Sequence, residues 1–85
     1  SLVSIVIPKG VTNIGGSAFS NCNALVSIVI PDSVINIGIM TFNYCPSLID
    51  VYYMGSEEDW SQIIFEWGNY AITPNMITYN YVYEE

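Results

Sequence analysis

The chain repeats itself every 23 residues, and this repeat constrains the fold more than any other feature. A shift of 23 places Leu2–Asn23 on Leu25–Pro46 with most positions identical. A third copy opens at Leu48 and stops matching after a few residues. A chain of 85 residues has room for one small domain and not for two separate cores. We therefore expect two full copies and the start of a third within residues 1–55, followed by a capping segment over residues 56–85.

Each copy has the pattern of short extended pieces joined by tight corners. In the first copy, an alternating β-branched stretch ends at Pro8, which has no N–H to give to a sheet. A second extended piece is expected over Val11–Ile14, with a corner of positive φ at Gly15. Phe19 and Cys22 stand three apart, which is the spacing of a single inward-facing helical or 3₁₀ turn.

Repeats too short to bury their own apolar faces must stack on one another. Equivalent residues then lie directly above each other, about 4.8 Å apart, as in a parallel sheet. The only three leucines of the chain occupy the same position in each copy, which indicates that this register is structural. The expected stacks are Leu2/Leu25/Leu48, Ile5/Ile28/Val51 and Phe19/Phe42.

The segment after the repeats is expected to close the last coil with a helix and a strand. Ser56 and Asp59 have capping-box spacing, so a helix should begin after Ser56. An apolar stripe at helical spacing then predicts a helix that lies across the open end of the array and stops at Gly68–Asn69. Alternating residues predict a final strand over 77–83. The stripe consists of Trp60, Ile63, Ile64 and Trp67.

These residues carry a resemblance to a known family. The pattern Leu-x-x-Ile-x-Ile-Pro-x-x-Val-x-x-Ile-Gly-x-x-Ala-Phe-x-x-Cys, from Leu2 to Cys22, resembles the BspA-like leucine-rich repeats of bacterial surface proteins. The run Val51–Trp60 is similar to the segment that ends such arrays, and Thr41 stands where the family prefers Ala. The resemblance implies a mainly β leucine-rich-repeat solenoid of parallel strands with a short helix, ended by a C-terminal helix–strand cap. It also implies a cell-surface or secreted location.

Composition removes most other classes of function. The chain has Lys9 as its only cation, no His, and a net charge of −7, so it lacks a basic patch for nucleic acid. We expect no catalytic site, no cofactor and no metal, because Glu57, Glu58 and Asp59 are explained by the charge preference of a helix start. An acidic hydrolase would need a second carboxylate opposite these. No apolar run is long enough to insert in a membrane, and the missing initiator Met indicates a piece of a longer protein.

The two cysteines occupy equivalent positions in successive copies. Stacking places the Cα atoms of Cys22 and Cys45 about 5 Å apart, which a disulfide tolerates. In-register neighbours nevertheless point their Cβ atoms the same way and so keep them too far apart for an ordinary bridge. We expect two free thiols, with a disulfide as the alternative, and a zinc site would lack ligands.

The outward positions of the first sheet are apolar, which is unusual for a face in contact with water. They indicate a protein-interaction face, although the β-propensity of valine explains them equally well. Ten of the twelve aromatic residues lie at or after Tyr44. They could cover the apolar end of the array as a cap, stack against a sugar, or contact another protein. The expected interaction face consists of Val3, Val6, Val26, Val29, Ile49 and Tyr52.

Two functional interpretations remain at this stage. By resemblance, the chain is a non-catalytic adhesion module that binds a protein on a host or neighbouring cell. The alternative is a structural end cap and spacer, with binding in upstream repeats. The first coil offers an unpaired strand edge around Ile5, so we also expect self-association through this coil or through the valine face.

Overall fold

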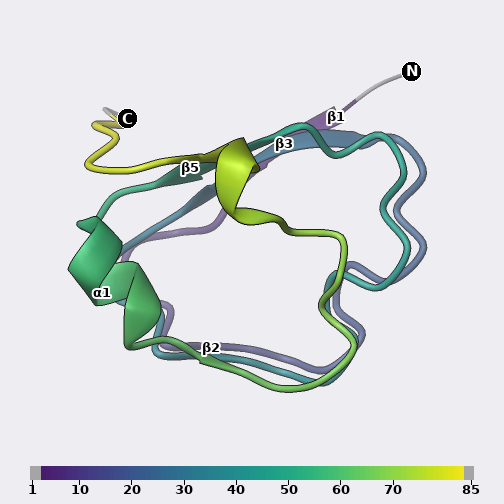
Figure 1. Ribbon diagram of the computed structural model, residues 1–85, viewed down its shortest axis with the longest axis horizontal. Helices are drawn as coiled ribbons and strands as arrows, with labels where there is room; N and C mark the ends of the chain where they lie inside the picture. Colours follow the sequence, from purple (N-terminus) through teal and green to yellow (C-terminus); the bar gives the residue numbers. More distant parts are fainter. Residues whose placement is uncertain (1–2, 84–85) are drawn as a thin grey trace.

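The computed structural model describes residues 3–83, which wind into three stacked coils and the start of a fourth (Figure 1). One sheet has four strands in the order β1-β3-β5-β7, and the other has three in the order β2-β4-β6. All pairs are parallel, so the predicted solenoid of mostly parallel strands with one short helix is confirmed. The elements are β1 (Val3–Val6), β2 (Asn13–Ile14), β3 (Leu25–Ile30), β4 (Asn36–Ile37), β5 (Asp50–Tyr53), α1 (Glu57–Ser61), β6 (Ile64–Phe65), the 3₁₀ turn η1 (Pro74–Met76) and β7 (Ile77–Thr78).

The register between coils follows the sequence repeat. Ile28 of β3 pairs with Ile5 of β1 on one side and with Val51 of β5 on the other, as predicted. The rings of Phe19 and Phe42 stack with centroids 5.4 Å apart, which confirms the second expected ladder. The leucine ladder is described from its second member onward, since Leu2 lies outside the described residues.

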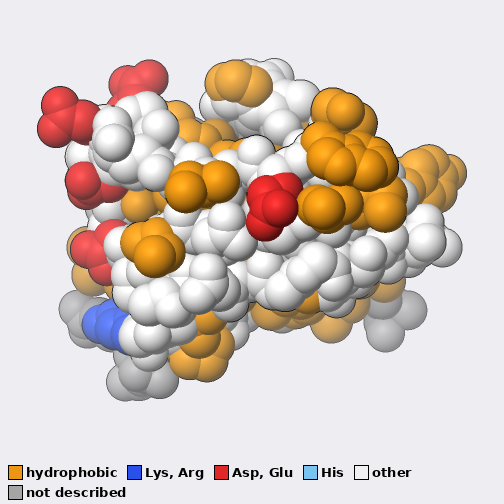
Figure 2. Space-filling model, turned by 90° about the horizontal axis from the view of Figure 1, so that it is seen from below, with side chains coloured by type: hydrophobic (Ala, Val, Ile, Leu, Met, Phe, Trp, Pro, Cys, Tyr) orange, Lys and Arg blue, Asp and Glu red, His pale blue; other side chains and the backbone are white. Residues whose placement is uncertain are grey.

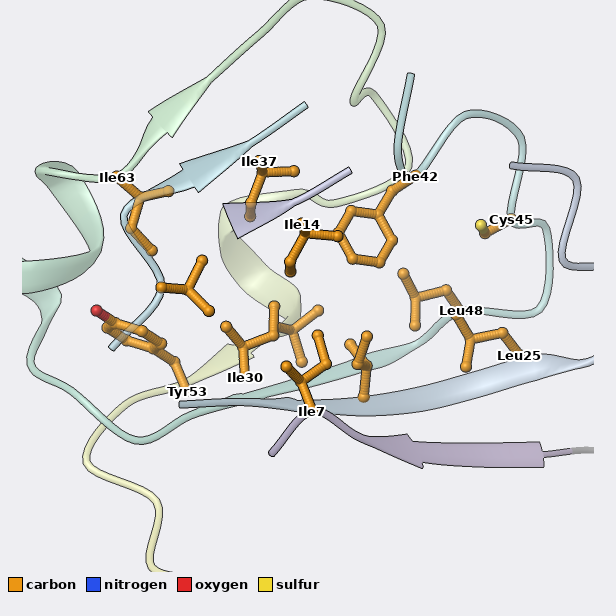
Figure 3. Packing of buried hydrophobic residues seen from close by; sticks show 13 residues of the cluster. Ile7, Ile14, Leu25, Ile30, Ile37, Phe42, Cys45, Leu48, Tyr53 and Ile63 are labelled. Carbon is orange, nitrogen blue, oxygen red and sulfur yellow. The ribbon is translucent and has the colours of Figure 1, made fainter. Parts of the chain in front are cut away.

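The core lies between the two sheets, where the inward side chains of each coil meet (Figure 3). Burying one large aliphatic side chain contributes roughly 1.5–3 kcal/mol, so this set is the main source of stability. The buried cluster consists of Ile7, Ile14, Leu25, Ile28, Ile30, Val34, Ile37, Phe42, Cys45, Leu48, Val51, Tyr53 and Ile63.

The stretch of the third coil between β5 and β6 is longer than the equivalent stretch of the coil before by the length of α1. β4 follows β2 by 23 residues, whereas Ile64 of β6 pairs with Asn36 of β4 at a separation of 64 − 36 = 28. The difference of 28 − 23 = 5 equals the five residues of α1. The coil therefore accommodates a helix at one corner and still returns to the register of the second sheet.

The predicted helix begins where expected and ends earlier than expected. Ser56 caps α1 and forms a reciprocal capping box with Asp59. The prediction that the helix reaches Trp67 is wrong, because the backbone of Ile64 donates to Ile35 O at 3.0 Å as part of β6. A helix this short is only marginally stable by itself, so pairing with the edge of β4 is favoured over continuing the helix. Trp60 and Ile63 pack against the core as expected, but Ile64 and Trp67 are exposed.

The corners of the coils use positive φ at positions other than the predicted glycines. Ser17 and Met40, which are equivalent residues, have φ of 62° and 53°. Gly15 and Gly38 do not have positive φ, so the predicted reason for their presence is wrong. At Gly38 the reason is close approach, because an added Cβ would lie 2.7 Å from the backbone N of Gly16 in the coil before. The segment from Phe19 to Cys22 forms turns rather than a regular helix.

A polar side chain at each later corner ties its coil to the one before. Thr41 is fully buried, and its hydroxyl lies 2.9 Å from the carbonyl oxygens of both Gly15 and Gly38. Asn69 does the same one coil later, since its Nδ2 donates to Gly38 O at 2.9 Å and to Glu66 O at 2.8 Å. The departure from Ala at Thr41 thus supplies an inter-coil hydrogen bond.

The final strand is also shorter than predicted. β7 ends at Thr78, and Asn80 has φ 55°, a conformation that breaks an extended strand. The chain stays close to β5 beyond this kink, because the N–H of Tyr81 donates to Tyr53 O at 2.9 Å.

Substituting Gly38 by Ala tests the close packing of the coils. We expect Gly38→Ala to lower the free energy of unfolding by about 1–3 kcal/mol or more, since the new methyl group meets backbone that has no room to move. Urea denaturation measures the change. The matched control is Gly15→Ala, where an added Cβ meets no atom within 4 Å. Equal stability of the two variants would contradict the packing described here.

Candidate interaction face

The outward face of the four-stranded sheet is built from two rows of side chains that alternate with the core residues. In the first row, the hydroxyl oxygens of Ser4 and Ser27 are 2.7 Å apart and share a hydrogen bond, and Asp50 follows them in register. This row is small and polar. The second row is larger and apolar, and it consists of Val6, Val29 and Tyr52.

The structure brings Val6, Val29 and Tyr52 together but does not expose them equally. Val6 is exposed, Tyr52 is half-buried, and Val29 is only 7% exposed. The expectation that Val29 faces water is therefore wrong. Val29 is buried but does not belong to the inner core cluster, and it lies on a strand flanked by β1 and β5, with Val6 and Tyr52 beside it in register.

The other predicted residues lie at the starts of the strands. Val3 and Ile49 are 48% and 61% exposed, and Val26 between them is half-buried. The register shifts here, since Val3 pairs with Leu25 rather than with Val26. This irregularity does not separate the coils, because Ile49 N still donates to Val26 O at 2.9 Å. The strand starts thus form the open part of the apolar face.

Figure 2 views the molecule from the side of the second sheet and shows several acidic side chains at the end that carries α1. Burial raises the pKa of the Tyr53 phenol, and the nearby carboxylates of Asp59 and Asp32 raise it further. Asp59 lies in the first turn of α1 because its side chain completes the capping box with Ser56. Within residues 3–83, no group of three or more His, Cys, Asp or Glu side chains is arranged to hold a metal ion.

Both cysteines are free, as predicted from their in-register position. Cys45 is buried, and its Sγ donates to Phe19 O at 3.2 Å. Burial raises the pKa of the Cys45 thiol above its ordinary value, which outweighs the opposing effect of a backbone hydrogen bond from Cys22. The thiol serves packing, not nucleophilic chemistry.

Aromatic residues close the third coil, which is one of the roles that the sequence predicts for them. Trp60 meets the edge of Tyr53 at a centroid distance of 4.9 Å and lies 5.2 Å from Phe65. Trp67 and Tyr70 stay exposed and border a hollow beside Trp60. Sequence reasoning missed the contact between Tyr81 and Tyr52, whose ring centroids are 4.6 Å apart. The alternation of tyrosines after Ile77 was the available signal for that contact.

Comparison with known proteins agrees with this geometry. The family model of the BspA-type leucine-rich repeat region (6 copies) matches residues 1–80. The chain belongs to this family. Leucine-rich repeats of this kind are generally non-catalytic and mediate protein binding. No curated protein and no solved structure is significantly similar to the chain. The described part of this BspA-type repeat contains no helix long and apolar enough to cross a membrane.

The raised pKa of Cys45 predicts how this BspA-type repeat responds to alkaline pH. The folded state holds the thiol proton more tightly than the unfolded state, so the stabilisation is complete below the ordinary pKa of a thiol, which the unfolded state keeps, and it declines as pH rises above that value. Urea denaturation at a series of pH values measures this decline. Cys45→Ala is the control, and its stability should fall less steeply. A parallel fall in both proteins would show that Cys45 is not the group responsible.

Proposed function

We propose that this chain is a non-catalytic interaction module that binds a protein through the outward face of its four-stranded sheet. The parent protein would be a bacterial cell-surface or secreted protein, and the module would serve adhesion to a host or neighbouring cell. Membership in the BspA-type family supports the protein-binding class. The geometry of the sheet supports the choice of face.

The single observation that carries the proposal is the open apolar surface at the strand starts. Val3 and Ile49 expose about half of their surface or more on the same edge of one sheet. Contiguous exposed aliphatic side chains on a sheet mark interaction surfaces more often than isolated ones do. Asp50 is the one acid among the paired residues of this sheet, whereas α1 carries three. A partner therefore meets little charge repulsion on this face.

The competing interpretation is an end cap and spacer, and the helix-bearing third coil favours it. Under that interpretation, the outward face would contact no partner. Self-association through the first coil also stays a prediction. Its residues Ile5, Val11 and Phe19 are only half-buried and border a shared hollow.

A displayed library of random peptides tests the proposed function. Selection on the folded chain should enrich peptides that lose at least about tenfold in affinity for Ile49→Lys, because a charge replaces exposed apolar surface at the centre of contact. The matched control is Ile35→Lys, since Ile35 is 59% exposed, close to the 61% of Ile49, and lies next to β4 in the other sheet. If no peptide is enriched, or if both variants lose the same peptide affinity, the end-cap and spacer interpretation would be favoured.

A further inference from the structure

The segment Tyr81–Tyr83, which we call the tail, lies against the outward face of the same molecule. Asn80 turns the chain with φ 55°, and its N–H donates to Gly55 O at 2.8 Å. The N–H of Tyr81 then donates to Tyr53 O at 2.9 Å. In Figure 1 the yellow segment after η1 runs beside β5 toward the corner that carries α1. The backbone of the tail is thus anchored to the end of β5, beyond the residues that pair with β7.

The side chains of the tail alternate between the face and the solvent. The Tyr81 ring lies on Tyr52 with centroids 4.6 Å apart and planes at 33°. Tyr83 borders a small hollow together with Val6 and Met54, which belong to the first and third coils. Val82 between them is exposed. This alternation is how an extended segment presents every second side chain to a surface.

The tail covers only the half of the face that lies at the strand ends. Tyr81 stacks on Tyr52, and Tyr83 borders a hollow with Val6, which stays 40% exposed. Tyr52 and Val6 flank Val29 in register. This placement agrees with the burial of Val29, which does not belong to the inner core. The strand starts at Val3 and Ile49 remain open. The face is therefore divided into a covered half and an open half.

The contacts of the tail are those of a ligand that is readily displaced. Aromatic stacking and main-chain hydrogen bonds hold it, and none of the side-chain hydrogen bonds found within residues 3–83 involves Tyr81 or Tyr83. Such contacts depend on the alternation of aromatic side chains along an extended backbone and not on a particular sequence. A segment of the same form in another protein could make them equally well.

We propose that the covered half of the outward face is a binding site for an extended peptide segment with aromatic side chains at alternate positions, and that the tail occupies this site in cis. This inference rests on the proposed function, and it specifies the partner as a segment with alternating aromatic side chains. A partner segment replaces the tail on Tyr52 and beside Val6 while the rest of the partner contacts the open strand starts. Tail release and partner binding are thus coupled through one surface.

A peptide of residues 80–85 added to full-length chains tests the proposal. In the double variant Tyr81→Ala, Tyr83→Ala the site is vacated, so the peptide should bind it at least about tenfold more tightly than it binds the wild-type chain. NMR shifts at Val6, Val29 and Tyr52 report binding, and unchanged signals of Ile28 report an intact core. A peptide with both tyrosines replaced by Ala should cause no shift. Tyr70→Ala is the control variant, because Tyr70 is 78% exposed and lies outside the face.

The outcomes separate this inference from the proposed function. Equal peptide affinity for the wild-type chain and the double variant, or no binding to a folded double variant, would overturn the inference. If the double variant does not fold, the single variant Tyr83→Ala is titrated in its place with the same criterion. Loss of library binding in Ile49→Lys would still support the proposed function in either case, since Ile49 lies outside the covered half.

Discussion

Main-chain hydrogen bonds between successive coils are the interaction on which this structure depends. They run in both directions, as when Ile7 N donates to Val29 O at 3.0 Å and Gly38 N donates to Ile14 O at 2.9 Å. A ladder of this kind holds only while the backbones stay close together and in register. It therefore requires glycine at position 38, because a Cβ there would clash with the backbone of Gly16 in the preceding coil. It also requires that extra residues be placed at a corner, as α1 is.

The same constraint produces the surface that the module offers to a partner. Because the strands are in register, equivalent outward residues form continuous rows across the coils, and the repeat makes each row uniform in character. The rows of Ser4 and Val6 are examples, one polar and one apolar. The aromatic residues of the non-repeating segment then modify this surface, since Tyr81 covers one end of it. Repetition supplies the face, and the irregular segment decides how much of it is open.

The repeat allowed most of the fold to be predicted, but the last coil could not be predicted in the same way. Ile5, Ile28 and Val51 align because their neighbours in sequence align as well. Ile64 and Phe65 have no such neighbours, and the apolar spacing around them fits a helix; only the free edge of β4 makes them a strand. For the same reason the burial of Val29 was missed, since Val29 lies on a strand with a neighbouring strand on each side, and these neighbours are distant in sequence.

The pairing of β6 with β4 is the most direct test of the claim that inter-coil hydrogen bonding overrides local helical preference. NMR cross-peaks between backbone protons measure it. We expect contacts between Ile37 and Phe65, at the 28-residue offset, together with slow exchange of the Glu66 amide, which donates to Ile37 O at 3.0 Å. Helical contacts from Ile63 to Glu66, without contacts to Ile37, would show that the helix continues and that inter-coil hydrogen bonding does not override the helical preference.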